Sequence, residues 1–127
     1  MSKVEVPKSL RIWFFIHFIV DMLFAIPLMF FPSKFLSFLN WGVINLFSTR
    51  LVGAALFAIG AVSLLKRNEG IESYKSLLLL KVLWSFAALV AILLSMLEGD
   101  HRFGWIIFGI FLMFFILWNY YLVKLKN

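Results

Sequence analysis

The chain has 127 residues, of which 64% are hydrophobic and only 14% are charged, and its formal net charge is +6. This composition is too apolar for the surface of a water-soluble domain of this size, and it indicates an integral membrane protein. The absence of cysteine excludes a disulfide framework and any cysteine-ligated metal or cluster.

Four stretches of the chain are apolar over about the 20 residues that an α-helix needs to cross a bilayer. Because these stretches use most of the chain, we expect residues 1–127 to form a single membrane domain. The predicted fold is all-α, a bundle of four transmembrane helices with a short amphipathic interfacial helix after the first span. The spans are residues 12–31, 46–65, 76–97 and 103–123, and the interfacial segment is residues 33–41.

The basic residues stand beside the spans, mostly in the head, the second connection and the tail, whereas the first connection has only Lys34 and the third only Arg102. By the positive-inside rule, both termini then face the cytoplasm, and we expect a multi-pass protein of the plasma membrane. Cations distributed in this way do not form the single basic face that nucleic acid would need. They are Lys3, Lys8 and Arg11 before the first span, Lys66, Arg67 and Lys75 between the second and third, and Lys124 and Lys126 after the fourth.

The first span carries two ionisable side chains within its apolar run. Asp21 falls near the middle of the bilayer, where insertion scales put the cost of a carboxylate at about 2.5 to 3.5 kcal/mol. His17 lies four residues earlier and therefore on the same helix face. Pro27 should kink this helix or end it early. We expect another part of the chain to neutralise Asp21.

Residues 33–41 follow the first span and alternate apolar with polar side chains at helical spacing. The segment is too short to cross a bilayer. This favours an amphipathic helix in the outer interface, anchored by Trp41. A short re-entrant loop lining a cavity is the alternative.

The second span is rich in small side chains, which let helix backbones approach closely in lipid. We expect this helix to be the most buried of the four or else to form a dimer seam. The residues predicted to pack are Gly53, Ala54, Ala58, Gly60 and Ala61.

The third and fourth spans add further polar residues. Lys81 lies a little over one turn inside the third span with Ser85 on the same face, and Asn119 lies near the inner end of the fourth. The fourth span is otherwise aromatic, and we expect its inner-end rings to lie at the lipid interface, namely Trp118, Tyr120 and Tyr121.

These polar residues fall at similar depths when about 1.5 Å per residue is counted from the cytoplasmic end of each span. His17, Lys81 and Asn119 lie roughly 6 to 8 Å inside, and Asp21 and Ser85 lie about 13 Å inside. We predict an inner polar layer in which the Lys81 ammonium neutralises Asp21. One interpretation is a cavity that binds a proton, an ion or a polar headgroup. The other is a buried ion pair that sets helix order and rotation.

A second ionic layer is expected in the outer leaflet. Arg50 lies near the outer end of the second span, from which its long side chain can extend outward. Glu98, at the outer end of the third span, is the predicted partner.

Motifs of known enzymatic mechanisms are absent from the sequence. There is no Gly-rich phosphate loop, no Gly-x-Ser-x-Gly elbow and no His-Glu-x-x-His. We therefore expect neither enzymatic activity nor a catalytic residue, a metal or a cofactor.

The segment 32–41 and the run Arg50-Leu51-Val52-Gly53-Ala54-Ala55, continuing to Gly60, resemble the DoxX-like group of small four-span membrane proteins. The resemblance implies the four-span topology with an amphipathic outer segment. Some proteins of that group are small subunits of quinone or redox complexes, and many have no assigned activity. The resemblance implies no catalytic residue.

Three functions fit these features. The first is a non-catalytic accessory subunit or homo-oligomer within a larger membrane complex, which acts by assembly or ligand binding. The second is a small transporter or channel coupled to protons or ions through Asp21. The third is a lipid or quinone binder that uses the aromatic fourth span together with the polar layer.

Overall fold

A computed structural model describes residues 5–39, 45–98 and 104–126 of the chain. It contains five α-helices in the order α1 (Lys8–Phe30), α2 (Pro32–Phe38), α3 (Leu46–Leu65), α4 (Ile71–Glu98) and α5 (Gly104–Lys126), and the described residues include no strand. Four of them are long and apolar enough to cross a membrane. The predicted all-α fold with four spans and a short helix after the first is therefore confirmed, and the chain is a multi-pass membrane protein.

Three of the four long helices extend beyond the predicted spans, and α3 has the predicted bounds. α1 begins four residues earlier than expected, directly after Pro7, and α4 begins five residues earlier at Ile71. Hydropathy measures only the apolar length of a helix, whereas backbone hydrogen bonding continues into polar turns such as that of Glu72 and Lys75. Pro27 does not end α1, because the helix continues to Phe30 and the Phe31 amide still donates to the Pro27 carbonyl.

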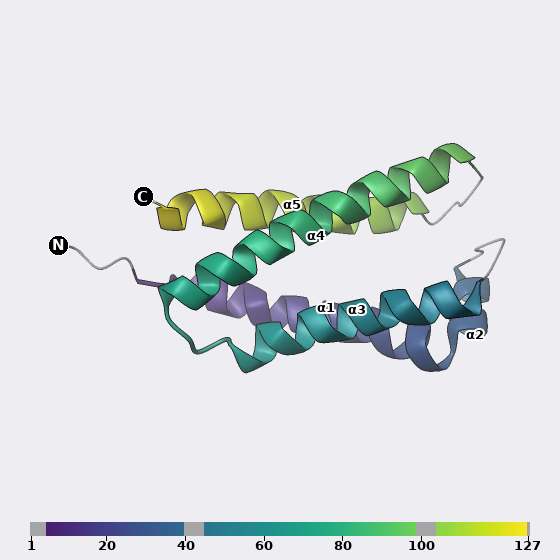
Figure 1. The fold of residues 1–127 in the computed structure, drawn as a ribbon, viewed down its shortest axis with the longest axis horizontal. Helices are drawn as coiled ribbons and strands as arrows, with labels where there is room; N and C mark the ends of the chain where they lie inside the picture. Colours follow the sequence, from purple (N-terminus) through teal and green to yellow (C-terminus); the bar gives the residue numbers. More distant parts are fainter. Residues whose placement is uncertain (1–4, 40–44, 99–103, 127) are drawn as a thin grey trace. The chain divides into compact units, whose positions relative to one another are not determined.

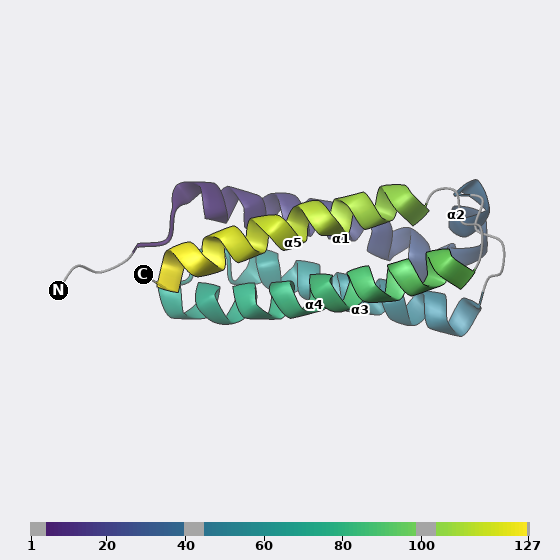
Figure 2. The same cartoon turned by 90° about the horizontal axis from the view of Figure 1, so that it is seen from above.

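Contacts divide the chain into two compact units. One comprises Lys8–Asn68, and the other comprises Glu69–Asn127 together with Met1–Pro7. In the first unit, α1 and α3 lie side by side and antiparallel, and α2 contacts both (Figure 1). In the second unit, α4 and α5 lie side by side (Figure 2). The expectation of a single membrane domain stays a prediction.

Helix α2 is held to the unit by its apolar side. Pro32 and Leu36 are buried, and the Phe35 ring meets Phe24 of α1 edge to face at 6.0 Å between ring centroids. The Lys34 side chain is exposed. The helix is thus short and two-sided, as expected for residues 33–41, while Trp41 lies outside the described residues.

Two glycines bring α3 close to α1. A Cβ atom added to Gly53 would lie 2.8 Å from Met29 Cγ, and one added to Gly60 would lie 2.8 Å from Asp21 Cβ. Ala61 is half-buried, and Ala54 and Ala58 are exposed. The buried share of α3 within the structure is smaller than that of α1. The burial of α3 relative to all four spans depends on how the two units pack, so the expectation that α3 is the most buried span stays a prediction. The alternative of a dimer seam, which Ala54 and Ala58 would form, stays a prediction.

Two arginines join α1 to the residues after α3 at the end of the pair where α1 begins and α3 ends. Arg11 Nη1 donates to the Arg67 carbonyl at 2.6 Å, and Arg67 Nε donates to the Arg11 carbonyl at 3.1 Å. The Arg67 guanidinium also lies over the Phe15 ring, 5.2 Å from its centroid. These bonds satisfy main-chain carbonyls at the end of a span, where cations are favoured.

Candidate functional site

His17 and Asp21 form a contact inside α1. Their spacing of four residues puts both on the buried stripe of the helix, which also includes Phe14 and Ala25. The distance from His17 Nε2 to Asp21 Oδ1 is 3.3 Å, and only 6% of each side chain is exposed. The structure therefore brings together two of the predicted site residues.

Gly60 of α3 faces this pair. An added Cβ would approach Asp21 Oδ2 to 3.2 Å as well as Asp21 Cβ, so the α3 backbone passes directly beside the carboxylate. This close approach is open only to a residue without a side chain. Gly60 thus narrows the space around Asp21 and helps to keep lipid tails from it.

Ser63 is a buried polar residue that sequence reasoning missed. It lies three residues after Gly60 on the same face of α3, and its Oγ donates to the Ile59 carbonyl at 3.0 Å. The signal that could have revealed it is this spacing from Gly60, because a residue one turn along the helix shares the same buried stripe.

Lys81 of α4 is buried, with 2% of the residue exposed. Its Nζ lies over the Trp118 ring of α5, 5.0 Å from the ring centroid, and Phe114 stacks on the same Trp at 5.4 Å. Desolvation strengthens a cation–π contact of this kind. The Trp118 ring thus stabilises the buried Lys81 ammonium.

The orientation of α5 differs from the expectation for its inner-end aromatic residues. Trp118 and Tyr121 are buried, and only Tyr120 is exposed. The prediction that all three rings lie at the lipid interface is therefore wrong for two of them. Aromatic type alone does not tell which face of a helix meets lipid.

Ser85 and Asn119 are bonded within their own helices. Ser85 Oγ donates to the Lys81 carbonyl at 2.6 Å, and Asn119 Nδ2 donates to the Phe115 carbonyl at 2.8 Å. Ser85 is buried beside Lys81 on α4, whereas Asn119 is half-buried. The predicted neutralisation of Asp21 by Lys81 joins residues of the two units, and it stays a prediction.

The two residues of the predicted outer layer, Arg50 and Glu98, differ from each other in their surroundings. Arg50 Nε donates to the Met29 carbonyl in the last turn of α1 at 3.1 Å. Glu98 ends α4 and is exposed. Their pairing with each other also joins the two units and stays a prediction. Within the described ranges, no three His, Asp or Glu side chains gather as a metal ion would need.

We compared the chain with known proteins and found no relative. No protein family, no curated protein and no solved structure matches the chain. The resemblance to DoxX-like proteins therefore stays a prediction based on residues 32–41 and 50–60.

Proposed function

We propose that this protein acts without covalent chemistry, by binding a proton or a small polar ligand at the His17–Asp21 pair within the membrane. It would do so as an accessory subunit or a homo-oligomer. The observation that carries the proposal is the 3.3 Å contact between two buried ionisable side chains in a helix apolar enough to span a bilayer. Such residues are costly in lipid and mark binding sites or proton paths by default.

The pair has the chemistry of a proton-binding site. An imidazole and a carboxylate in contact hold a proton between them, and the charge of the pair changes by one when that proton leaves. Gly60 packs directly beside the carboxylate and leaves little room there. This arrangement supports exchange of a proton or a small ligand rather than a site for a large substrate.

The hydroxyl groups of the two buried serines favour binding over catalysis. A serine nucleophile would have to donate its proton to the imidazole. Ser63 and Ser85 both donate to main-chain carbonyls of their own helices instead. We therefore assign the His17–Asp21 pair no part in acyl transfer.

We expect the Asp21 carboxyl group to titrate in lipid. Infrared difference spectra of proteoliposomes, recorded across a pH series, should contain a carboxylic-acid C=O band that disappears in Asp21→Asn. His17→Gln should move the pH at which this band changes, because it removes the group that shares the proton.

Glu72→Gln is the control for that measurement, since Glu72 is an exposed carboxyl group on the first turn of α4. This substitution should leave the Asp21 band and its titration as they are in the parent protein. The Asp21 band could instead stay constant across the pH series. The pair would then exchange no proton, and this result would contradict the proposal in favour of a purely structural pair.

Charge distribution supports a plasma-membrane topology with both termini in the cytoplasm. Arg11 and Arg67 lie together at the end of the α1–α3 pair where α1 begins and α3 ends. Lys8 and Lys66 belong to the same end. Cations near span ends are retained on the cytoplasmic side.

Cysteine labelling tests this topology directly, because the chain has no native cysteine. Asn68→Cys, in an exposed position after α3, should react with a membrane-impermeant maleimide only after the cells are opened. Lys34→Cys, exposed on α2, should react in intact cells. The reverse pattern would invert the proposed orientation.

A further inference from the structure

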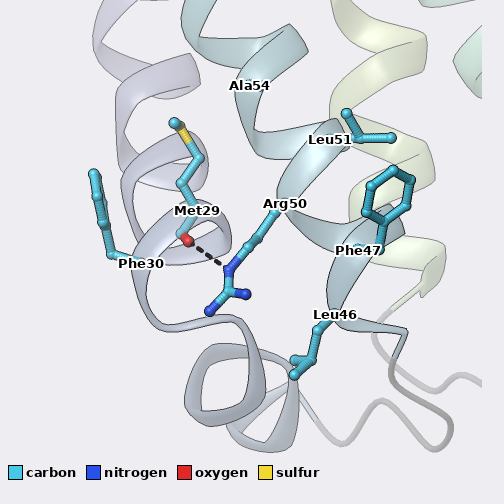
Figure 3. A pocket seen from close by; sticks show the side chains of 7 residues that line it. All are labelled: Met29, Phe30, Leu46, Phe47, Arg50, Leu51 and Ala54. Atoms are coloured by element: carbon cyan, nitrogen blue, oxygen red, sulfur yellow. Dashed lines mark hydrogen bonds between the residues drawn. The ribbon is translucent and has the colours of Figure 1, made fainter.

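We propose that the pocket at the α2 end of the α1–α3 pair binds an anionic phospholipid, with its phosphate at Arg50 and an acyl chain along the apolar wall. The pocket has a volume of about 580 Å³. Volumes of roughly 300 to 1,000 Å³ are typical of sites for small ligands. Figure 3 shows the residues that line it, which are Met29, Phe30, Leu46, Phe47, Arg50, Leu51 and Ala54.

The composition of the wall indicates the class of ligand. Six of its seven residues are apolar, and Arg50 is the one that carries a charge. A free polar metabolite would make no favourable contact with the apolar wall. A neutral hydrocarbon would leave the Arg50 cation without a counter-charge. A molecule with one anionic end and a long apolar body matches both parts of the surface.

The guanidinium is held in place with donors to spare. Its Nε donates to the Met29 carbonyl at 3.1 Å, so the α1 main chain orients the planar group. In Figure 3, the two outer nitrogens extend past Nε and away from that carbonyl. Among residues 5–39, 45–98 and 104–126, the Arg50 guanidinium makes a hydrogen bond only through Nε. Two parallel N–H groups suit the oxygens of a phosphate.

The position of the pocket suits a lipid of the bilayer. Arg50 lies four residues after the start of α3, about 6 Å along the helix axis. From this depth an arginine reaches the level of the headgroups, while its stem stays among apolar groups. Phe47 and Phe30 are exposed, with exposed fractions of 75% and 64%, so the apolar wall is open to acyl chains.

The experiment is native mass spectrometry of the full-length protein in detergent that contains phosphatidylglycerol and phosphatidylcholine with identical acyl chains. The parent protein should retain phosphatidylglycerol in preference to phosphatidylcholine. Arg50→Met should lower the ratio of the two retained lipids about fivefold, the effect expected for one arginine beside a lipid with net negative charge, because the choline of phosphatidylcholine neutralises its phosphate. Arg50→Lys, which keeps the charge, should keep most of the preference.

Two variants serve as controls. Lys34→Met removes an exposed cation of α2 in the same unit and should leave the lipid ratio unchanged. Ala54→Phe fills the pocket without touching the charge, and it should lower retention of both lipids. Because Ala54 is exposed, this variant keeps the proposal testable if Arg50→Met does not fold.

Four outcomes would overturn the proposal. The first three are equal retention of the two lipids by the parent protein, an equal effect of Arg50→Met and Lys34→Met, and unchanged retention in Ala54→Phe. Displacement of phosphatidylglycerol by an excess of inorganic phosphate would also overturn it, because the site would then recognise the free anion and not the lipid.

Discussion

Gly60→Ala is expected to lower the free energy of unfolding in detergent by about 1 to 2 kcal/mol. The new methyl group would lie 2.8 Å from Asp21 Cβ, an atom next to the main chain that cannot move without shifting α1. Overpacking of this kind costs about 1 to 3 kcal/mol, and the better helix propensity of alanine offsets up to about 1 kcal/mol of it. Denaturant titration followed by circular dichroism measures the loss.

Gly109→Ala is the matched control, since a Cβ added at that position of α5 would meet no atom within 4 Å beyond the adjacent backbone of its own helix. It should leave stability unchanged or raise it by up to about 1 kcal/mol, because only helix propensity changes. Equal stability of Gly60→Ala and the parent protein would show that α1 and α3 are further apart at Asp21 than the structure indicates.

The second large effect is expected at the buried pair itself. His17→Leu should cost about 2 kcal/mol of stability, because it removes a partner of the Asp21 carboxylate in a buried position. Asp21→Asn should remove the negative charge from the other side of the same contact. If the two side chains stabilise each other, the double variant should be more stable than additivity predicts by about 1 kcal/mol or more.

Additive losses in this cycle would mean that the 3.3 Å contact carries no coupling energy. The same cycle with Lys81→Met tests the prediction that the Lys81 ammonium neutralises Asp21. Breaking one half of a buried ion pair leaves an uncompensated charge, so Lys81→Met should partly restore the stability of Asp21→Asn. Lys75→Met, at a more exposed cation of α4, should restore none of it.

Much of the fold could be predicted because it depends on length and hydropathy. Four apolar stretches of spanning length become four helices, since backbone groups in lipid must be satisfied within each helix. The contact between His17 and Asp21 could be predicted for the same local reason, because residues four apart on a helix lie on one face.

The parts of the candidate site that sequence reasoning missed depend on helix rotation. The burial of Trp118 over Lys81 requires α5 to turn this ring inward, although its residue type is common at lipid interfaces. Hydropathy could not decide this, because apart from Asn119 and the lysines at its end α5 has no polar face. Likewise, the bond from Arg50 to the Met29 carbonyl depends on the end of α1 lying beside the start of α3.

The sequence by itself determined that this is an all-α, four-span membrane protein and that Asp21 and His17 share a helix face. Both follow from local rules of hydropathy and helical periodicity. Only the tertiary structure decided that Gly60 closes on Asp21, that Trp118 covers Lys81 and that Arg50 lines a pocket. Each of these depends on how one helix is rotated against another, and packing between nearly uniform apolar surfaces sets that rotation without leaving a periodic signal in the sequence.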